Sequence, residues 1–163
     1  MRNTLALALV LSCLALVRGL DLTAAMQQPQ HTPQTTATSP ALEQRDQPVT
    51  DDDLRILLKA RELLKNDSVW NRKDDRECTD DEATGKRSLF CVLQKACIGV
   101  LGTYDHRRVA LQEVRFAVEE ATRGQDFEHR LRDFNNLPTT RLVDIHKVLQ
   151  IATDRVKARL KKR

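Results

Sequence analysis

The sequence predicts an all-α fold, a small compact bundle of four to five helices that follows a disordered N-terminal segment. After Thr50, apolar residues recur mainly at steps of three and four, which is the spacing of one face of an α-helix. Proline, which interrupts helices, occurs in this part of the chain only at Pro138. Residues 51–163 are also numerous enough to enclose one hydrophobic core, so we expect a single helical domain there.

The first 19 residues have the pattern of a secretory signal peptide. Arg2 precedes thirteen residues without a charge, 5–17, and the small residue Gly19 closes the segment. This apolar run is too short to span a bilayer as a helix, which takes about 20 residues. We therefore expect cleavage after Gly19, a mature chain without a transmembrane segment, and a secreted, extracellular location.

Other interpretations of this N-terminus stay open. Cleavage after Ala24 or Ala25, and retention of the segment as an uncleaved anchor, are alternatives. A bacterial lipobox that ends at Cys13 is a weaker one, because residues 14–17 remain apolar where a lipoprotein normally turns polar.

Residues 20–50 predict a disordered linker. The stretch is rich in Pro, Thr and Gln and has almost no large apolar residue after Met26. Such a composition buries too little apolar surface to offset the entropy lost on ordering. A plain spacer is the favoured interpretation, and Ser and Thr beside Pro would also suit O-glycosylation in a eukaryote.

The first helix is expected to begin after Thr50 and to reach about Lys65. Thr50 and Asp53 have the spacing of a capping box, with Asp in place of the usual Glu. The side chains that then share one face lie at helical spacing: Leu54, Leu57, Leu58, Arg61 and Leu64.

The second helix is expected between Ser88, as its N-cap, and Gly102, as its stop. Its apolar side chains leave little polar face: Leu89, Phe90, Val92, Leu93, Ala96, Cys97, Val100 and Leu101. A helix that is apolar nearly all round is typical of a buried, central position.

The remaining elements follow from the same spacing. A third helix is expected from Asp105 to Gly124, with an apolar face of Val109, Ala110, Val114, Ala117, Val118 and Ala121. A short turn or helix follows at Phe127, Leu131 and Phe134. After Pro138, Thr139 or Thr140 is expected to cap the last helix, whose apolar stripe is Leu142, Ile145, Leu149, Ala152, Val156 and Leu160.

The polar stretch from Trp70 to Arg87 is the longest irregular segment expected in the domain and the best candidate for an exposed site. It contains an acidic cluster, residues 74–82. The cluster lacks the Gly and the terminal Glu of an EF-hand, so we favour a solvated loop over a weak cation site and expect no metal centre.

Three short motifs carry a family resemblance. An amphipathic segment ends at Trp70, the pair Phe90-Cys91 opens the next helix, and the turn Phe134-Asn135-Asn136 precedes Pro138. In this order and spacing the chain resembles the uncharacterised DUF6197 family, small proteins common in actinobacteria and their phages, over about residues 54–158. The family usually has Trp where Phe134 stands, and it usually lacks a signal peptide and a long linker. The resemblance implies a helical fold and no known activity.

The mature chain keeps three cysteines, Cys78, Cys91 and Cys97. Cys91 and Cys97 lie six residues apart on one helix, about 9 Å along its axis, which is too far for a disulfide. In an oxidising compartment we therefore expect Cys78 to pair with Cys91 or Cys97 and to hold the polar loop on the second helix. Three free thiols are the alternative, and zinc is disfavoured because the paired C-x-x-C spacing is missing.

The sequence identifies no catalytic residue and no cofactor site. The histidines fall in no metal-binding motif. A small enzyme that uses a histidine with Cys91 or Cys78 is an alternative, because the two members of such a pair need to be close in the folded structure and not in the sequence. Asn66 begins an N-glycosylation acceptor, Asn66-Asp67-Ser68, which counts only in a eukaryote.

Positive charge is concentrated at the C-terminus. Residues 50–154 carry 18 basic and 20 acidic side chains, a net charge of −2, whereas residues 155–163 carry six basic side chains, a net charge of +6. A basic amphipathic end suits an anionic surface, and cations also suit a helix C-terminus. Large aromatic side chains are few and no second basic stripe occurs, so we expect no specific nucleic-acid binding.

Together these observations favour a secreted helical domain that acts by binding an unknown protein partner rather than by catalysis, in the manner of a secreted effector. The alternatives are the small Cys/His enzyme and an anionic-surface binder that uses the basic C-terminal helix. The residues expected to contact a partner are Trp70, Asn135, Asn136, Arg155, Arg159 and Lys162.

Overall fold

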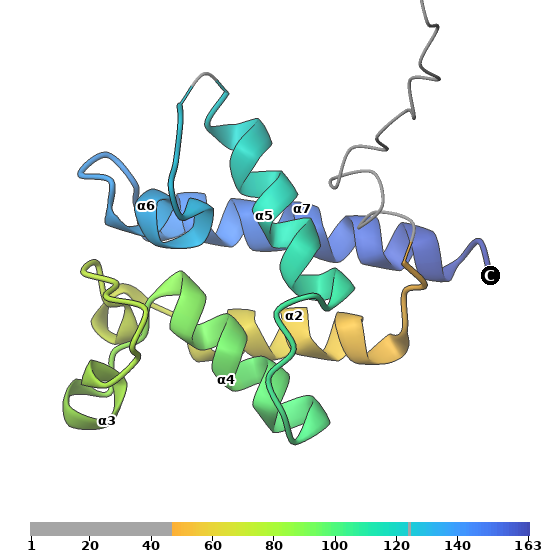
Figure 1. The fold of residues 1–163 in the computed structure, drawn as a ribbon, viewed down its shortest axis with the longest axis horizontal. Helices are drawn as coiled ribbons and strands as arrows, with labels where there is room; N and C mark the ends of the chain where they lie inside the picture. The colour runs from red at the N-terminus through yellow and green to blue at the C-terminus, as the bar shows by residue number, and fades with distance from the viewer. Residues whose placement is uncertain (1–46, 124) are drawn as a thin grey trace, which may run out of the picture. The chain divides into compact units, whose positions relative to one another are not determined.

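The computed structural model describes residues 47–123 and 125–163. The expected signal peptide, residues 20–46 of the expected linker, and Gly124 lie outside these residues. The described chain forms six α-helices and one short 3-10 helix, so the predicted all-α class is confirmed (Figure 1). The elements are α2 (Asp51–Leu63), η1 (Asp67–Val69), α3 (Asp80–Thr84), α4 (Leu89–Leu101), α5 (Val109–Ala121), α6 (Arg130–Asn136) and α7 (Leu142–Leu160).

The longest of the described helices, α7, packs along α5 and α2, and α4 packs on α2 and α6 (Figure 1). The apolar stripe predicted for the last helix is confirmed, since Leu142, Ile145, Leu149, Ala152 and Val156 are all buried in one continuous core. The short α3 lies within the segment that was predicted to be irregular. None of the described helices combines the length and the apolar character that crossing a membrane requires.

The prediction that α4 is buried nearly all round is wrong. Its inward side chains, including Val92, Leu93 and Ala96, are fully buried, but Ile98 is 45% exposed. The reason lies in the packing: α4 contacts α2 and α6, whereas α2 is covered by α4, α5 and α7 together. Apolar composition therefore misidentified which helix is central.

The capping signals at α2 and α4 are confirmed. The backbone N–H of Thr50 donates to Asp53 Oδ2 at 2.9 Å, as the capping box requires. Ser88 Oγ accepts the N–H of Cys91 at 3.2 Å at the start of α4. Gly102 ends α4 with a φ of 77°, a left-handed conformation that glycine adopts without steric cost.

The start of α5 differs from the prediction, because the helix begins at Val109 and not at Asp105. The carboxylate of Asp105 closes a turn instead, accepting the N–H of Arg107 at 2.9 Å. The first turn of α5 receives its acceptor from another helix, since Asp53 Oδ1 accepts the N–H of Ala110 at 3.1 Å.

The cap expected for α7 is also wrong. Arg141 is the N-cap, and its N–H donates to Asp144 Oδ2 at 2.9 Å. Thr140 is buried in the preceding turn, where its N–H donates to the Leu137 carbonyl at 3.1 Å and its own carbonyl accepts from Arg72 at 2.9 Å. Both backbone groups of Thr140 are therefore hydrogen-bonded outside α7, and Thr140 does not cap this helix.

Candidate functional site

The polar loop 71–87 is tied to α4 by a disulfide. Cys78 and Cys91 are bonded, with their Cα atoms 5.4 Å apart. The sequence left Cys91 and Cys97 open as partners of Cys78, and the loop meets Cys91 because this residue stands in the first turn of α4. Cys97 is free and buried, and burial raises the pKa of its thiol.

Beside the disulfide, the loop backbone takes an uncommon conformation. Arg76 and Cys78 have φ angles of 68° and 61°, in the left-handed region that residues with a side chain seldom adopt. Two carboxylates hold it: Asp74 Oδ1 accepts the N–H of Arg76 at 2.7 Å, and Asp75 Oδ1 accepts the N–H of Glu77 at 2.9 Å. These members of the acidic cluster therefore bind the backbone of their own loop.

Asn135, near the end of α6, links three segments beneath the loop. Its Oδ1 accepts the indole N–H of Trp70 at 2.9 Å and the backbone N–H of Leu89 at 3.0 Å. Its Nδ2 donates to the carbonyl of Asn71 at 2.9 Å. Asn135 is fully buried and Trp70 is 5% exposed. The structure thus brings these two residues, expected to contact a partner, together in the interior.

Asn136 holds the loop from the same helix. Its Oδ1 accepts the N–H of Asp74 at 2.7 Å, and its Nδ2 donates to the carbonyl of Asp74 at 3.0 Å. Asp74 is itself buried, and burial raises the pKa of its carboxyl, although the Ser88 hydroxyl and the Arg76 N–H oppose the shift. Because both backbone groups of Asp74 are bound by one side chain, this part of the loop is anchored to α6.

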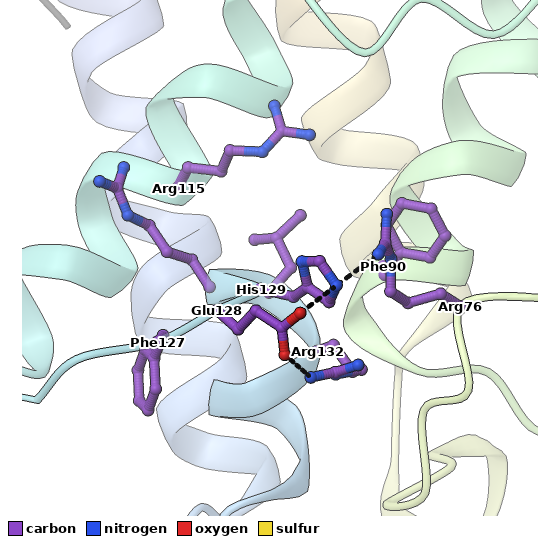
Figure 2. Close-up of a pocket in the computed structure, with 9 residues that line it drawn as sticks. Arg76, Phe90, Arg115, Phe127, Glu128, His129 and Arg132 are labelled. Carbon is purple, nitrogen blue, oxygen red and sulfur yellow. Dashed lines mark hydrogen bonds and ion pairs between the residues drawn. The ribbon is translucent and has the colours of Figure 1, made fainter.

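A pocket of about 340 Å³ lies where the anchored loop meets α4, α5 and the segment that leads into α6 (Figure 2). Four arginines, one histidine and one glutamate line it together with three apolar side chains: Arg76, Arg115, Arg130, Arg132, His129, Glu128, Phe90, Phe127 and Leu131. The excess of positive charge makes this basic pocket the candidate functional site.

Arg76 forms the loop side of the basic pocket. Its Nη1 lies 2.6 Å from Nε2 of His129, and its guanidinium lies over the ring of Phe90, 5.9 Å from the ring centroid. Figure 2 shows Arg76 and Phe90 on one side and Glu128, His129 and Arg132 facing them. A cation above an aromatic face is held by the quadrupole of the ring, so Phe90 helps to orient Arg76.

Arg115 enters the basic pocket from α5. Its Nη1 donates to the carbonyl of His106 at 2.9 Å. Burial lowers the pKa of Arg115, Tyr104 opposes this shift, and the positive charges of Arg130 and Arg76 add to it. Burial is the largest cause of this lowered pKa, and the two neighbouring arginines contribute less. Arginine nevertheless stays charged at physiological pH, so Arg115 brings a positive charge into the pocket.

Carboxylates compensate only part of this charge. Arg130 pairs with Glu119 at 3.1 Å, and Arg132 pairs with Asp133 at 2.7 Å. Burial alone would raise the pKa of Asp133, but the backbone N–H of His129 and the guanidinium of Arg132 outweigh burial and lower that pKa. The positive charges of Arg130 and Arg132, the two arginines of α6, are therefore each paired with a carboxylate.

The other two arginines differ. Among the side chains that the structure describes, no carboxylate lies within the 4.0 Å of an ion pair from Arg76 or Arg115. The one acidic residue that lines the pocket, Glu128, is 3.6 Å from Arg132 and 3.7 Å from His129. Among the described residues, the guanidinium groups of Arg76 and Arg115 therefore have no carboxylate as an ion-pair partner.

The basic C-terminal helix is partly occupied by internal ion pairs. Arg155 lies 2.6 Å from Glu120, and Arg159 lies 2.9 Å from the buried Glu113. Arg159 also donates to the carbonyl of Gln47, ahead of α2. Of the three tail residues expected to contact a partner, Lys162 is the exposed one.

The acceptor Asn66 lies in an exposed position before η1. Its Oδ1 accepts the N–H of Ser68 at 3.1 Å and the Ser68 hydroxyl at 2.6 Å. The structure therefore gives this asparagine a capping role, in addition to its place in the predicted glycosylation motif.

The basic pocket was not found from the sequence. Its arginines come from the loop, α5 and α6, and none of these segments is a basic run by itself. A weak signal was present in Arg130 and Arg132, which flank Leu131 directly after His129. Among the side chains that the structure describes, no three from His, Cys, Asp or Glu gather in a way that could hold a metal ion.

Comparison with known families gives one match. A family model described as "Family of unknown function (DUF6197)" covers residues 48–155, which include every residue that lines the basic pocket. No curated protein and no solved structure matches the chain.

Proposed function

The chain belongs to DUF6197, a family of unknown function, and we propose that it is a secreted helical domain that acts by binding a partner rather than by catalysis. The partner contacts the basic pocket and the loop 71–87 beside it. An exported factor that works on other molecules from outside the cell, such as an effector, fits this description.

The uncompensated charge of Arg76 and Arg115 is the observation that carries the proposal. Both side chains line one pocket, and no described carboxylate pairs with either. A concave, positively charged site attracts an anionic group and speeds its encounter. The disulfide and the asparagine anchors hold the pocket in place before binding, which lowers the ordering cost of association.

The state of the cysteines favours binding over catalysis. The sulfurs of Cys78 and Cys91, the nucleophiles of the enzyme hypothesis, are bonded to each other. Cys97 is buried and burial raises its thiol pKa, whereas a reactive cysteine needs access and a lowered pKa.

Two features support export. The N-terminal 19 residues have the pattern of a signal peptide, and a disulfide is expected to persist in an oxidising compartment. Intact mass of the protein from a secreting host tests this part of the proposal. A mass that begins at Leu20 supports export, and a full-length chain retained in the cells overturns it.

Site-specific photo-crosslinking tests the partner-binding part. A crosslinking amino acid is placed at the exposed Asp126, next to the pocket-lining Phe127, and in a matched protein at Val143, which is 59% exposed on α7. After incubation of the secreted protein with target cells, we expect a discrete adduct from position 126 that is lost in Arg76→Gln. Equal adducts from both positions, or adducts that persist in Arg76→Gln, would overturn the proposal.

A further inference from the structure

We propose that the basic pocket binds a tetrahedral oxyanion carried on an organic group, that is, a phosphate or sulfate monoester of the partner. This inference rests on the proposed function and names the chemical group that the partner presents. It comes from the direction of the donors, from the number of uncompensated charges, and from the apolar walls.

The donors approach the pocket from separate directions. Arg76 comes from the loop, Arg115 from α5, and Arg132 from α6 (Figure 2). Each guanidinium carries five N–H groups in a planar fork, and the described bonds use only part of them: Arg76 bonds to His129, and Arg115 bonds to the His106 carbonyl and to the Tyr104 side chain. A tetrahedral oxyanion presents terminal oxygens in several directions at once, whereas a carboxylate presents two oxygens in one plane. The arrangement therefore favours the tetrahedral group.

The charge balance fits a dianion. Arg130 pairs with Glu119, and Arg132 pairs with Asp133 and, at 3.6 Å, with Glu128, so Arg76 and Arg115 are the two positive charges that no described carboxylate pairs with. A phosphate monoester carries about −1.5 to −2 at neutral pH, which matches these two charges. A carboxylate would leave one of them without a partner. A sulfate monoester carries a single charge but offers the same tetrahedral set of oxygens, so charge alone separates the two esters in the test.

The apolar walls favour an ester over the free ion. Phe90 lies against Arg76 and is packed edge-on against Tyr104, with ring centroids 6.3 Å apart, and Phe127 lines the pocket from the segment before α6. An inorganic ion would leave these half-buried rings uncovered, while the organic part of an ester can contact them.

Calorimetric titration of the full mature protein, with its disulfide intact and at fixed ionic strength, tests the inference. The probes are phenyl phosphate, phenyl sulfate, benzoate and inorganic phosphate. We expect phenyl phosphate to bind at least about tenfold tighter than benzoate and tighter than inorganic phosphate, because it alone combines two charges, tetrahedral oxygens and a ring. Tighter binding of phenyl sulfate would identify the sulfate ester as the source. If benzoate bound as tightly as either of the two esters, the inference would be overturned.

Variants of the same protein separate the site from general charge. Arg76→Gln and Arg115→Gln should each weaken phenyl phosphate at least about tenfold, since each removes a charged donor. The control Arg55→Gln removes an arginine whose side chain is 64% exposed and which pairs with Asp52 on α2, a helix that contributes no residue to the lining of the pocket, so it should leave binding unchanged. Equal weakening by all three variants would mean non-specific attraction and would overturn the inference.

Glu128→Gln gives a result that misfolding cannot imitate. It removes the only carboxylate among the described pocket-lining residues, so phenyl phosphate should bind several-fold tighter. Unchanged or weaker binding would contradict the inference. If no ester binds but the crosslink from position 126 still depends on Arg76, the partner-binding function stands and the ester alone fails. If the crosslink also fails, both are wrong.

Discussion

Asp53 Oδ1, in the first turn of α2, accepts the backbone N–H of Ala110, in the first turn of α5, at 3.1 Å. The same carboxylate caps its own helix, because Oδ2 accepts the N–H of Thr50 at 2.9 Å, and it pairs with Arg108 at 3.1 Å. One fully buried side chain therefore caps the N-termini of two helices and balances the positive charge of Arg108.

Replacing Asp53 should be among the most destabilising single changes in the domain. Asp53→Ala removes acceptors from both helix starts and leaves Arg108 without its carboxylate, and breaking such a buried pair costs about 3–5 kcal/mol. We expect the free energy of unfolding, measured with urea, to fall by that amount. Asp52→Ala is the matched control, since Asp52 pairs with Arg55 at the surface and should cost at most about 1 kcal/mol. Equal losses in the two variants would contradict the capping role.

Asn135→Ala should loosen the support of the loop. The substitution leaves two buried donors, the indole N–H of Trp70 and the backbone N–H of Leu89, without their acceptor, and an unsatisfied buried donor costs about 1–3 kcal/mol. We expect lower stability together with a change in the fluorescence of Trp70, the single tryptophan of the chain. The exposed Gln125→Ala serves as control. A variant with native stability and unchanged tryptophan emission would argue against this network.

Asp74 should make the stability depend on pH. Burial raises the pKa of Asp74 above its ordinary value of 3.8, so the folded state binds the proton more tightly than the unfolded state. Stability from this group is therefore present at low pH and is lost as pH rises from about 3.8 through the raised folded pKa.

The variant Asp74→Asn keeps an oxygen for the Arg76 N–H and removes the charge. The free energy of unfolding of the variant minus that of the natural chain should increase as pH rises through this range, and should then become constant. Urea unfolding at a series of pH values measures the difference. A difference that stays constant or declines with pH would show that the carboxyl of Asp74 is not destabilised by burial.

The cysteines should give a defined pattern of thiol labelling. In a mature chain that begins at Leu20, we expect one thiol, Cys97, to react in denaturant without reductant and three to react after reduction. Replacing Cys78 and Cys91 by serine should lower the free energy of unfolding by about 2–4 kcal/mol, since the bridge constrains the unfolded chain. Three reactive thiols before reduction would rule out the disulfide in the secreted protein.

The sequence predicted those features whose causes lie within a few residues of one another. The capping box of Thr50 and Asp53, the cap at Ser88 and the stop at Gly102 each depend on one turn of chain, and the stripe on α7 depends on helical periodicity. For the same reason the all-α class and the family resemblance could be inferred from local spacing alone.

The sequence could not predict features made by segments that meet only after folding. The cap of α5 comes from a residue 57 positions away, and Arg76 meets His129 across 53 positions. The choice of Cys91 over Cys97 depends on where the loop meets α4, and the exposure of Ile98 depends on which helix its neighbours cover. By itself the sequence determined the all-α class and the apolar stripe of α7, because hydrophobic periodicity is local. The face predicted for the first helix was partly wrong, since Leu58 is 46% exposed and Ile56, which was left out, is fully buried. Only the tertiary structure decided where isolated arginines gather into one pocket, because charge adds up in space and not along the chain.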